Sequence, residues 1–473
     1  MFNLVKGTHD IILNEADKYT YVEQTLVQFA EFYNFKEFRT PIIESSDLFQ
    51  RSVGDSSDIV RKEMYTFLDK GDRSITLRPE ITAGIIRSIV NNKLLALGDY
   101  PVKAYYVGPC FRYERPQQGR YRQFNQFGIE IAGVTSPYRD VEAISFGYFA
   151  LKLLGFENLK LKINSLGDDE SRKNYRDALT KYFASYIDQM CDDCKDRYKL
   201  NVLRILDCKA KEDQEIIKNA PKISDYLTDK SKDYFNKVLK SLDELGIEYE
   251  IDDGLVRGLD YYSDVVFEFH YTSSKGLSYG ALGAGGHYNK LIGEIGGPKD
   301  CEGCGLAMGI ERLVSVMEDD QLFDNLDDSL DCYVMPLSME YQSDALNISS
   351  SLRLNGFKSE VNLEGKSLKA MFKKANKLNA KFALIIGEDE IKTNSIICKD
   401  LSSEQQESVG IQDLIDYLDS HIGSDEEHHH EGGCSSNHEG HENCCCHDHE
   451  NDHHCCHEHG QEHECCNESK KEK

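Results

Sequence analysis

The sequence of 473 residues contains no tryptophan, only 9 prolines and 8 methionines, and no uninterrupted apolar run of 18 residues. A helix needs an apolar run of about that length to cross a bilayer, so we expect no membrane span and no membrane partner. The first residues, MFNLVKGTHDII, lack the basic-then-apolar layout of a secretory signal peptide. These absences predict a cytoplasmic protein.

Basic residues are also scarce, because 55 Lys and Arg stand against 82 Asp and Glu, a net charge of −27. Residues 424–473 contain 14 acidic residues and 3 lysines, so −11 of this charge belongs to the last segment. Local basic patches can still bind RNA against an acidic background. The overall charge therefore leaves RNA binding open, while we expect no DNA partner.

The chain is too long for one hydrophobic core and should contain two or three domains. Its 40% apolar and 10% aromatic residues are typical of a globular protein. The composition changes at DDQLFDNLDDSLD (319–331) and again after HIGSDEE, which begins at residue 421. We therefore predict domains over 1–325 and 330–421, followed by a tail over 424–473.

Apolar periodicity predicts both helices and strands in the first domain, and a small α/β domain of alternating strands and helices after residue 331. The expected elements are a helix over 16–33, an extended segment over 38–44, strands over 102–108 and 127–133 joined by the turn RPQQGR, a helix over 140–154, a strand over 159–164, helices over 168–250, a strand over 265–270, the glycine-rich run YGALGAGGHY and a final helix starting near residue 305.

The segment from Leu77 to Glu130 places many charged and polar side chains in sequence that otherwise reads as buried strand. They are Arg78, Glu80, Arg87, Arg112, Glu114, Arg115, Arg120, Arg122, Gln126 and Glu130. Buried charges need a partner or a ligand. Guanidinium groups match phosphate oxygens, so a nucleotide triphosphate fits this set. Internal Arg–Glu pairs are the alternative.

Four further motifs accompany this hairpin: KGTHD (6–10), FRTPIIESSDLFQRSVG (38–54), LVRGLDYYSDVVFEF (255–269) and GLAMGIERL (305–313). Together, in this order, they resemble the class II aminoacyl-tRNA synthetases. The segments RGLDYY and FRYERP (111–116) make the histidyl-tRNA synthetase family the close match, over residues 1–421.

The resemblance implies an α+β fold for the first domain, with an antiparallel catalytic sheet flanked by helices and a helical insertion at about 168–250. It implies a homodimer built through the segment around Pro41, and an anticodon-binding domain over 331–421. The implied substrates are ATP with Mg²⁺, histidine and tRNA(His). Activation brings the histidine carboxylate to the α-phosphate, so cationic groups must offset the developing charge.

Individual roles follow from the resemblance alone. It implies that Arg112 and Arg257 bind the α-phosphate and act in catalysis, and that Glu114 binds the adenine. The remaining phosphates would be bound by Arg312 with Arg120 or Arg122. The residues implied for histidine are Glu80, Thr82, Gln126, Glu130, Tyr261, Tyr262 and Tyr288.

Some of these assignments have simpler alternatives. One of the adjacent tyrosines 261 and 262 could be ordinary core. The glycines of YGALGAGG could let strands pack closely instead of admitting a ligand. Arg312 could be a solvated surface residue.

The chain also departs from the family pattern. His287 and Asn289 replace an arginine and an aspartate, and Gln118 replaces a common lysine. The alternative function is a non-catalytic regulatory paralogue or a sensor of uncharged tRNA, against which the complete arginine set argues.

Cysteines occur in two C-x-x-C pairs, Cys191 with Cys194 and Cys301 with Cys304, and Cys208 lies further along. Structural zinc prefers four ligands, and no fourth is evident beside the first pair and Cys208. We interpret these thiols as small buried residues. A metal at Cys191, Cys194 and Cys208 and a site shared between the two pairs are the alternatives.

The tail contains 12 of the 16 histidines and 8 of the 16 cysteines, and CCHDHENDHH, CCHEHGQEHE and CCNE repeat with a period of ten. It has no apolar residue other than cysteine, so we expect disorder without a ligand. Thiolate and imidazole select transition metals such as zinc or nickel. The candidate ligands are Cys444, Cys445, Cys446, His447, His449, His453, His454, Cys455, Cys456, His457, His459, His463, Cys465 and Cys466. The alternative for the tail is an inert solubilising segment or a remnant of an expression tag. The alternative for the whole protein is a metal buffer in which the folded domains only carry the tail.

Overall fold

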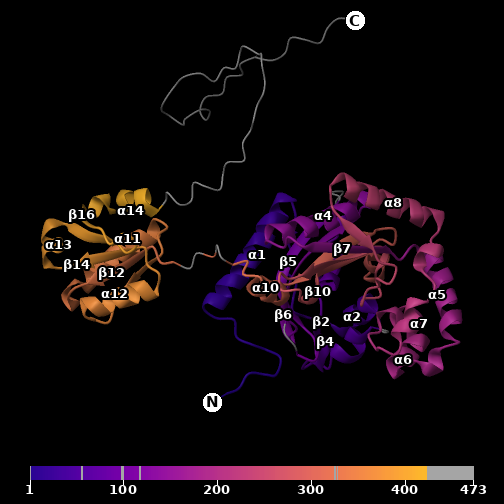
Figure 1. Ribbon diagram of the computed structural model, residues 1–473. Helices are drawn as coiled ribbons and strands as arrows, with labels where there is room; N and C mark the ends of the chain where they lie inside the picture. The colour runs from indigo at the N-terminus through magenta and orange to yellow at the C-terminus, as the bar shows by residue number, and fades with distance from the viewer. Residues whose placement is uncertain are drawn as a thin grey trace, which may run out of the picture. The chain divides into compact units, whose positions relative to one another are not determined.

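The computed structural model describes residues 2–54, 57–96, 101–116, 119–323, 326 and 329–422. The chain divides into two compact units, Met1–Asp328 and Ser329–Lys473, and each is described by itself (Figure 1). The predicted disorder of the tail, its candidate metal ligands and Gln118 lie outside the described residues. Across the described part of the chain, no helix is long and apolar enough to span a membrane.

The first unit is built on an eight-stranded sheet, in the order β1-β5-β6-β11-β10-β9-β7-β8. The strands are β1 (Lys36–Glu37), β5 (Val102–Phe111), β6 (Gln123–Ala132), β7 (Leu159–Ser165), β8 (Tyr249–Ile251), β9 (Ser263–Thr272), β10 (Ser278–Tyr288) and β11 (Gly303–Gly309). Only the edge pairs β1·β5 and β7·β8 are parallel. The α+β class with an antiparallel-dominated sheet is therefore confirmed.

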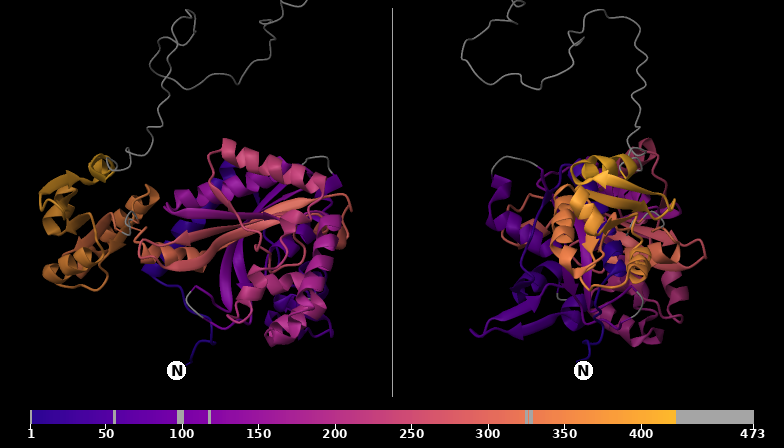
Figure 2. Two further views of the ribbon diagram at one scale, coloured as in Figure 1. Left: turned by 45° about the vertical axis from the view of Figure 1, so that its right-hand side comes forward. Right: turned by 90° about the vertical axis from the view of Figure 1, so that its left-hand side faces the viewer.

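Four helices cover one face of this sheet: α1 (Asn14–Phe32), α4 (Pro137–Leu153), α8 (Asp229–Glu244) and α10 (Ile310–Asp319) (Figures 1 and 2). The predicted helix over 16–33 is confirmed as α1, whose Val22, Leu26 and Ala30 are fully buried. Beneath these helices, Phe127 and Phe267 join one large core. Burial of this apolar surface gives the sites on the opposite face a rigid base.

The predicted hairpin is also confirmed, because β5 and β6 pair from Val102 opposite Ala132 to Phe111 opposite Gln123. The final helix starts later than expected. Residues 303–309 form strand β11 between β6 and β10, and α10 begins only at Ile310. The apolar residues Cys304, Leu306 and Met308 alternate with small ones, which is the period of a strand.

The other face of the sheet carries α3 (Thr82–Asn91) and α9 (Leu291–Glu294), with a second core around Ile85, Tyr106 and Tyr288. Next to it, a three-stranded sheet in the order β2-β4-β3 and helix α2 (Ser46–Val53) complete this side. Its strands are β2 (Ile43–Ser45), β3 (Tyr65–Leu68) and β4 (Ser74–Leu77).

Between β7 and α8 the chain forms short helices, namely α5 (Asp169–Phe183), α6 (Asp192–Leu200), α7 (Gln214–Lys218) and the 3₁₀ turn η4 (Val202–Asp207). They share a small separate core that includes Leu179, Phe183 and Ile205. Helix α8 lies in the same predicted segment, but its Phe235 and Val238 belong to the main core.

The second unit is a five-stranded sheet, in the order β13-β12-β14-β15-β16. Its elements are β12 (Cys332–Pro336), α11 (Gln342–Leu354), β13 (Ser359–Val361), α12 (Leu368–Lys377), β14 (Phe382–Ile386), α13 (Glu388–Thr393), β15 (Ser395–Asp400), β16 (Gln406–Gly410) and α14 (Leu414–Ile422). The first three strands are parallel and the last two antiparallel, so the expected α/β alternation is confirmed.

Candidate active site

A cavity of about 490 Å³ lies at the face of the large sheet where β6, β9, β10 and β11 meet the start of α3 and α10. Most of the residues implied for ATP and histidine line it. They are Glu80, Thr82, Arg112, Glu114, Arg120, Gln126, Arg257, Tyr261, Tyr262 and Arg312. Segments more than 200 residues apart in the chain, such as those of Glu80 and Arg312, thus converge on one cavity.

Arg112 follows directly after β5, where its Nε donates to the Pro79 carbonyl at 2.8 Å. Glu114 lies 3.8 Å from the Arg112 guanidinium and 3.7 Å from that of Arg120. These separations are too long for tight ion pairs, so both arginines retain hydrogen-bonding capacity for an anionic ligand.

Arg257 is held more firmly, because its Nη1 donates to Glu268 Oε1 at 2.6 Å. His270 Nε2 contacts the other oxygen of Glu268 at 2.8 Å. Burial would raise the pKa of Glu268, but hydrogen bonds and charge from His270 and Arg257 outweigh it and lower that pKa.

Glu268 and His270 also line the cavity, although neither was predicted to be a site residue. Strand periodicity was the available signal. In VVFEFH the two polar residues share one face, while Phe267 and Phe269 point to the core on the other.

Arg312 lies in the first turn of α10, where its Nη1 donates to the Ala281 carbonyl at 2.6 Å. Burial, and then the charge of Arg120, lower its pKa. Its position in the cavity wall contradicts the alternative of a solvated surface residue.

Arg122 is placed differently from Arg120. Its guanidinium stacks 3.8 Å from the Tyr113 ring centroid, and its Nε donates to the Glu114 carbonyl at 3.3 Å. It is not among the residues that line the cavity, whereas Arg120 is. Of the two arginines considered for the phosphates, the structure therefore brings only Arg120 to this space.

Glu130 lies behind the wall and accepts hydrogen bonds from hydroxyl groups. Thr82 Oγ1 donates to Oε1 at 2.6 Å, Tyr288 OH donates to Oε2 at 2.9 Å, and Tyr106 OH lies 3.4 Å from Oε1. Burial raises the pKa of Glu130 to about 8, because three hydroxyls compensate only part of the lost hydration. Neither Glu130 nor Tyr288 lines the cavity itself.

The other residues implied for histidine sit at the cavity wall. Glu80 accepts from the Ala83 N–H at 3.1 Å, and burial raises its pKa to about 6. Gln126 Oε1 is 3.2 Å from Cys110 Sγ. Tyr261 and Tyr262 both line the cavity, with ring centroids 4.5 Å apart, so neither is ordinary core alone.

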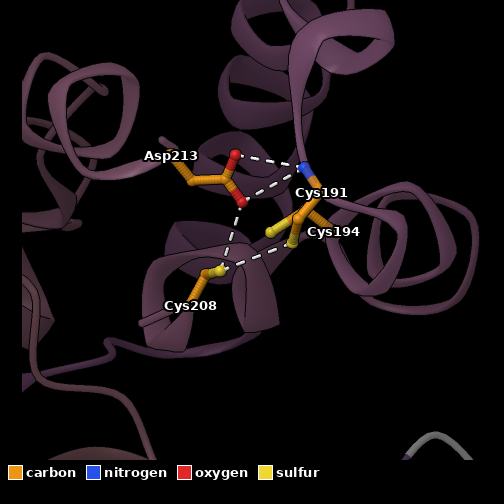
Figure 3. A group of neighbouring side chains, drawn as sticks. All are labelled: Cys191, Cys194, Cys208 and Asp213. Carbon is orange, nitrogen blue, oxygen red and sulfur yellow. Dashed lines mark hydrogen bonds between the residues drawn. The ribbon is translucent and has the colours of Figure 1, made fainter. Parts of the chain in front are cut away.

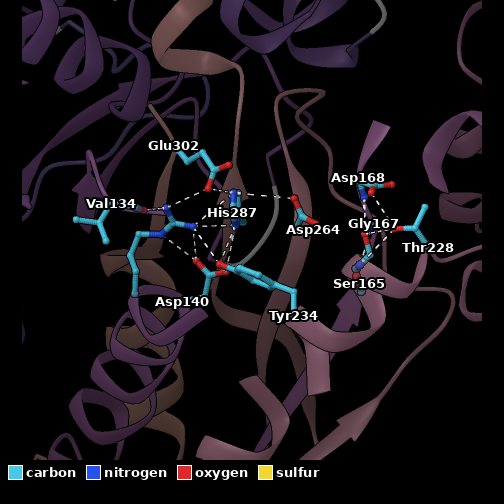
Figure 4. Close-up of polar contacts among 12 residues, drawn as sticks. Val134, Asp140, Ser165, Gly167, Asp168, Thr228, Tyr234, Asp264, His287 and Glu302 are labelled. Carbon is cyan, nitrogen blue, oxygen red and sulfur yellow. Dashed lines mark hydrogen bonds and ion pairs between the residues drawn. The ribbon is translucent and has the colours of Figure 1, made fainter. Parts of the chain in front are cut away.

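His287 belongs to a buried ionic network behind the wall (Figure 4). Its Nδ1 lies 2.8 Å from Arg139 Nη2 and 3.1 Å from Asp140 Oδ2, and its Nε2 lies 3.4 Å from Glu302 Oε2. Burial alone would lower the pKa of His287, but the two carboxylates raise it to about 9. The departure at 287 therefore changes this network and not the cavity lining.

The glycine-rich run packs closely against neighbouring strands at two positions and lines the cavity at others. A Cβ on Gly285 would lie 2.2 Å from the Gly305 carbonyl oxygen, and one on Gly286 would lie 2.7 Å from that of Val265. These two glycines permit close strand packing. Gly283 and Gly280 line the cavity, where a ligand could approach the backbone.

Comparison with known proteins accounts for this arrangement. Residues 7–313 match the family model described as histidyl-tRNA synthetase, and residues 331–421 match that of an anticodon binding domain. The chain belongs to the histidyl-tRNA synthetase family. It is thus built as a class II aminoacyl-tRNA synthetase, with the catalytic and anticodon-binding parts that the motifs implied.

Individual relatives agree with this placement. The chain is 46% identical to the histidine–tRNA ligase of Bacillus licheniformis, over 88% of this chain and 98% of the relative. It is also similar to the crystal structure of apo Staphylococcus aureus histidyl-tRNA synthetase, with 38% identity and a TM-score of 0.75, over 88% of this chain and 100% of that one.

A third structure shares the fold alone. An ATP phosphoribosyltransferase regulatory subunit/histidyl-tRNA synthetase from Bacillus halodurans matches with 21% identity and a TM-score of 0.58, over 82% of this chain and 99% of that one. The fold therefore does not decide between a synthetase and a regulatory subunit, and the cavity residues must.

Proposed function

We propose that this synthetase is a histidine–tRNA ligase, which activates histidine with ATP, releases pyrophosphate and transfers the histidyl group to tRNA(His). One observation carries the proposal: Arg112, Arg257 and Arg312 converge on a single cavity. A regulatory subunit without ATP chemistry has no need for three convergent guanidinium groups in a partly buried space.

Activation joins two anions, and the arginines suit this step. Arg257 and Arg112 would bind the α-phosphate, where negative charge develops as the carboxylate attacks. Arg312 and Arg120 would bind the outgoing phosphates. Because fixed donors need no reorganisation during the reaction, their placement favours the transition state over the bound substrates.

Magnesium would arrive with ATP. Glu80 and Glu311 already accept hydrogen bonds from backbone N–H groups and Glu268 pairs with Arg257, whereas Glu114 lies 3.7–3.8 Å from two arginines and keeps its oxygens available. These pairings leave few free carboxylate oxygens, so phosphate oxygens and water would supply most of the ligands that Mg²⁺ prefers.

Histidine would bind beside the arginines. Gln126 and Glu130 lie four residues apart on β6 and so point to the same face of the sheet. Because Glu130 and Tyr288 lie behind the cavity wall, Glu130 would accept a hydrogen bond from the imidazole only after wall residues move on binding, with Tyr261, Tyr262 and Tyr288 around the ring. Glu80, Thr82 and Gln126 would bind the ammonium group, and Glu114 would contact the adenine.

A second cavity of about 640 Å³ supports an RNA partner. It shares Tyr261 with the first cavity, and Asn289 is in its wall. Its cationic lining residues, Arg51, Arg172, Lys173, Arg176, Lys199 and Lys290, outnumber the acidic Asp169, Asp260 and Glu294, although Lys290 is paired with Asp169 at 2.6 Å. Such a group can bind successive phosphates, and we propose that the acceptor end of tRNA(His) approaches the first cavity along it.

The test is histidine-dependent ATP–pyrophosphate exchange on purified, metal-stripped protein with magnesium added back. We expect exchange with histidine and none with the other amino acids. Charging of tRNA(His) would follow in a second assay. Absence of exchange in the folded protein would overturn the proposal in favour of a regulatory paralogue or a sensor of uncharged tRNA.

We further propose a homodimer in the cytoplasm. Ile42, Ile43, Phe67 and Leu68 are 40–64% exposed on the small sheet and the segment that leads into it from Pro41. A second copy would cover this apolar surface. Light scattering at several concentrations should give twice the chain mass, and Phe67→Glu should shift it toward the monomer.

For the tail we propose binding of zinc or nickel through its cysteines and histidines, as an addition to the synthetase. The support is compositional: soft thiolate and imidazole ligands repeat every ten residues. Equilibrium dialysis of the full chain against a variant ending at residue 423 tests it. Equal metal content in the two chains would leave only a solubilising role.

A further inference from the structure

The short helices between β7 and α8 bring four potential metal ligands together (Figure 3). Cys191 precedes α6 and Cys194 lies in its first turn, Cys208 follows the η4 turn, and Asp213 precedes α7. One ligand atom from each lies within 4.8 Å of all the others.

Two of the distances already resemble a coordination shell. Cys191 Sγ and Cys208 Sγ are 3.7 Å apart, and Cys208 Sγ is 3.2 Å from Asp213 Oδ2. Sulfur atoms bound at about 2.3 Å from one tetrahedral zinc ion would be about 3.8 Å apart. Small side-chain movements would therefore place one ion between the four groups.

The charge of Asp213 points to a cation. Its carboxylate is fully buried and accepts from the Cys191 N–H at 3.1 Å and from the Cys208 thiol. Among the residues that the structure describes, no Lys, Arg or His forms an ion pair with it. Hydrogen bonds from the Cys191 N–H and the Cys208 thiol compensate part of the burial of this carboxylate, and a divalent ion at the cluster would supply the opposite charge that it lacks.

We propose that Cys191, Cys194, Cys208 and Asp213 form a structural zinc site. Four protein ligands close the shell, which is typical of structural and not catalytic zinc. Three thiolates favour zinc over magnesium or calcium. The Ala210 N–H approaches Cys208 Sγ at 3.4 Å, the kind of outer contact that supports a metal-bound thiolate.

The spacing C-x₂-C-x₁₃-C-x₄-D agrees with such a site, but only the three cysteines could be recognised in the sequence. Asp213 is one of many acidic residues in this segment, and the fold alone sets it apart. Cys301 and Cys304 do not join the site: Cys304 is buried in the main core, and within the described ranges only the first cluster gathers three or more such ligands.

A metal ion would add to the stability of this helical module. Helix α6 has 9 residues, α7 has 5, and their buried core is small. Modules of this size often depend on a metal or disulfides for stability. Binding would release one proton from each thiol and change no oxidation state.

The proposed zinc ligands are also close in sequence to residues that line or contact the first cavity. Lys209, which lines that cavity, directly follows Cys208. Arg204 of the η4 turn donates to the Gly258 carbonyl, and Asn201 Nδ2 donates to Asp260 Oδ1 at 3.2 Å. Zinc would thus fix residues 201–209 against the loop that carries Arg257, so its loss should lower exchange activity as well as stability.

Thiol labelling of the full chain tests the proposal, because it reports on these cysteines separately from the tail. Reduced protein is treated with N-ethylmaleimide in the presence of zinc or after chelation, and its peptides are weighed. We expect at least tenfold slower labelling of Cys191, Cys194 and Cys208 with zinc. Cys332 and Cys398, buried in the second unit, should label equally slowly in both samples.

Two outcomes would overturn the proposal. Equal protection with and without zinc would mean that the thiols are merely buried. A Cys191–Cys208 disulfide in unreduced protein would mean a redox pair in place of a metal site.

A pair of variants provides a second test. Asp213→Asn should hold one zinc fewer per chain than the wild type, measured by elemental analysis at equal thiol content. Asp225→Asn, an exposed acid of the same module, should keep the full zinc content. Circular dichroism and the Cys332 labelling rate verify folding; an unchanged zinc content in folded Asp213→Asn would contradict the proposed ligand set.

Discussion

Arg257 pairs with Glu268, and its proposed role is at the α-phosphate and not in binding histidine. Its substitution should therefore affect turnover and histidine binding differently. Arg257→Ala removes a charge that acts mainly as the α-phosphate reacts. We expect kcat for ATP–pyrophosphate exchange to fall by about 10²–10³-fold, with little change in the KM for histidine. Arg39→Ala, whose side chain is 83% exposed, is the matched control. Unchanged turnover in Arg257→Ala would refute the assigned role.

The buried carboxyl group of Glu130 should make the stability of the protein depend on pH. Its pKa rises from 4.5 unfolded to about 8 folded, because burial disfavours the carboxylate. The folded protein then binds more protons than the unfolded one between these values, so Glu130 lowers stability progressively as pH rises through this range. Above pH 8 the full penalty, on the order of a few kcal/mol, applies.

Glu130→Gln has no such penalty. Its melting temperature relative to the wild type should therefore increase between pH 5 and pH 9. The exposed Glu340→Gln should show a constant difference over the same range. A Glu130→Gln difference that does not depend on pH would show that the carboxyl titrates near its ordinary value.

At the scale of elements, strand β11 shows why glycine is needed beside a buried carboxylate. A Cβ on Gly305 would lie 1.9 Å from Glu130 Oε2 and 2.6 Å from the Ile129 carbonyl oxygen. Gly305→Ala should therefore destabilise the protein by about 1–3 kcal/mol and weaken histidine binding by displacing Glu130. Denaturant unfolding and the KM for histidine measure the two effects.

The control for this substitution is Gly71→Ala. Its added Cβ would come no closer than 3.4 Å to Asp69, so stability should change little. If Gly305→Ala were equally harmless, β6 and β11 would have to separate more easily than their continuous pairing from Gly303 to Gly309 indicates.

At the scale of the whole molecule, the synthetase part of the chain should function independently of the tail, residues 424–473. The relative from Bacillus licheniformis aligns over 98% of its own length but over only 88% of this chain, and the two family matches end at residue 421. We expect deletion of residues 424–473 to leave histidine-dependent exchange within twofold of the full chain. It should remove most bound zinc but leave one equivalent at the Cys191 cluster.

Kinetics with and without added zinc would test this independence. A zinc-dependent change in exchange rate, present in the full chain and absent from the shortened one, would instead mean that the tail regulates the enzyme. Loss of all zinc on deletion would contradict the structural site.

The sequence by itself determined the elements whose periodicity is strong. Helix α1, the β5–β6 hairpin and the alternating second unit depend on local apolar spacing, which neighbouring residues set. Motif order was also sufficient to indicate the family. Strand β11 was mistaken for the start of a helix because glycines and short apolar residues give no local preference; its pairing on both sides decides its conformation.

Only the tertiary structure decided which charged residues meet. It brought Glu268 to Arg257, separated Arg120 from Arg122, and placed His287 in a network behind the cavity. Asp213 became the fourth ligand beside three cysteines in the same way. Contacts of this kind join residues far apart in the chain, and their energies depend on burial and distance, which no local spacing encodes.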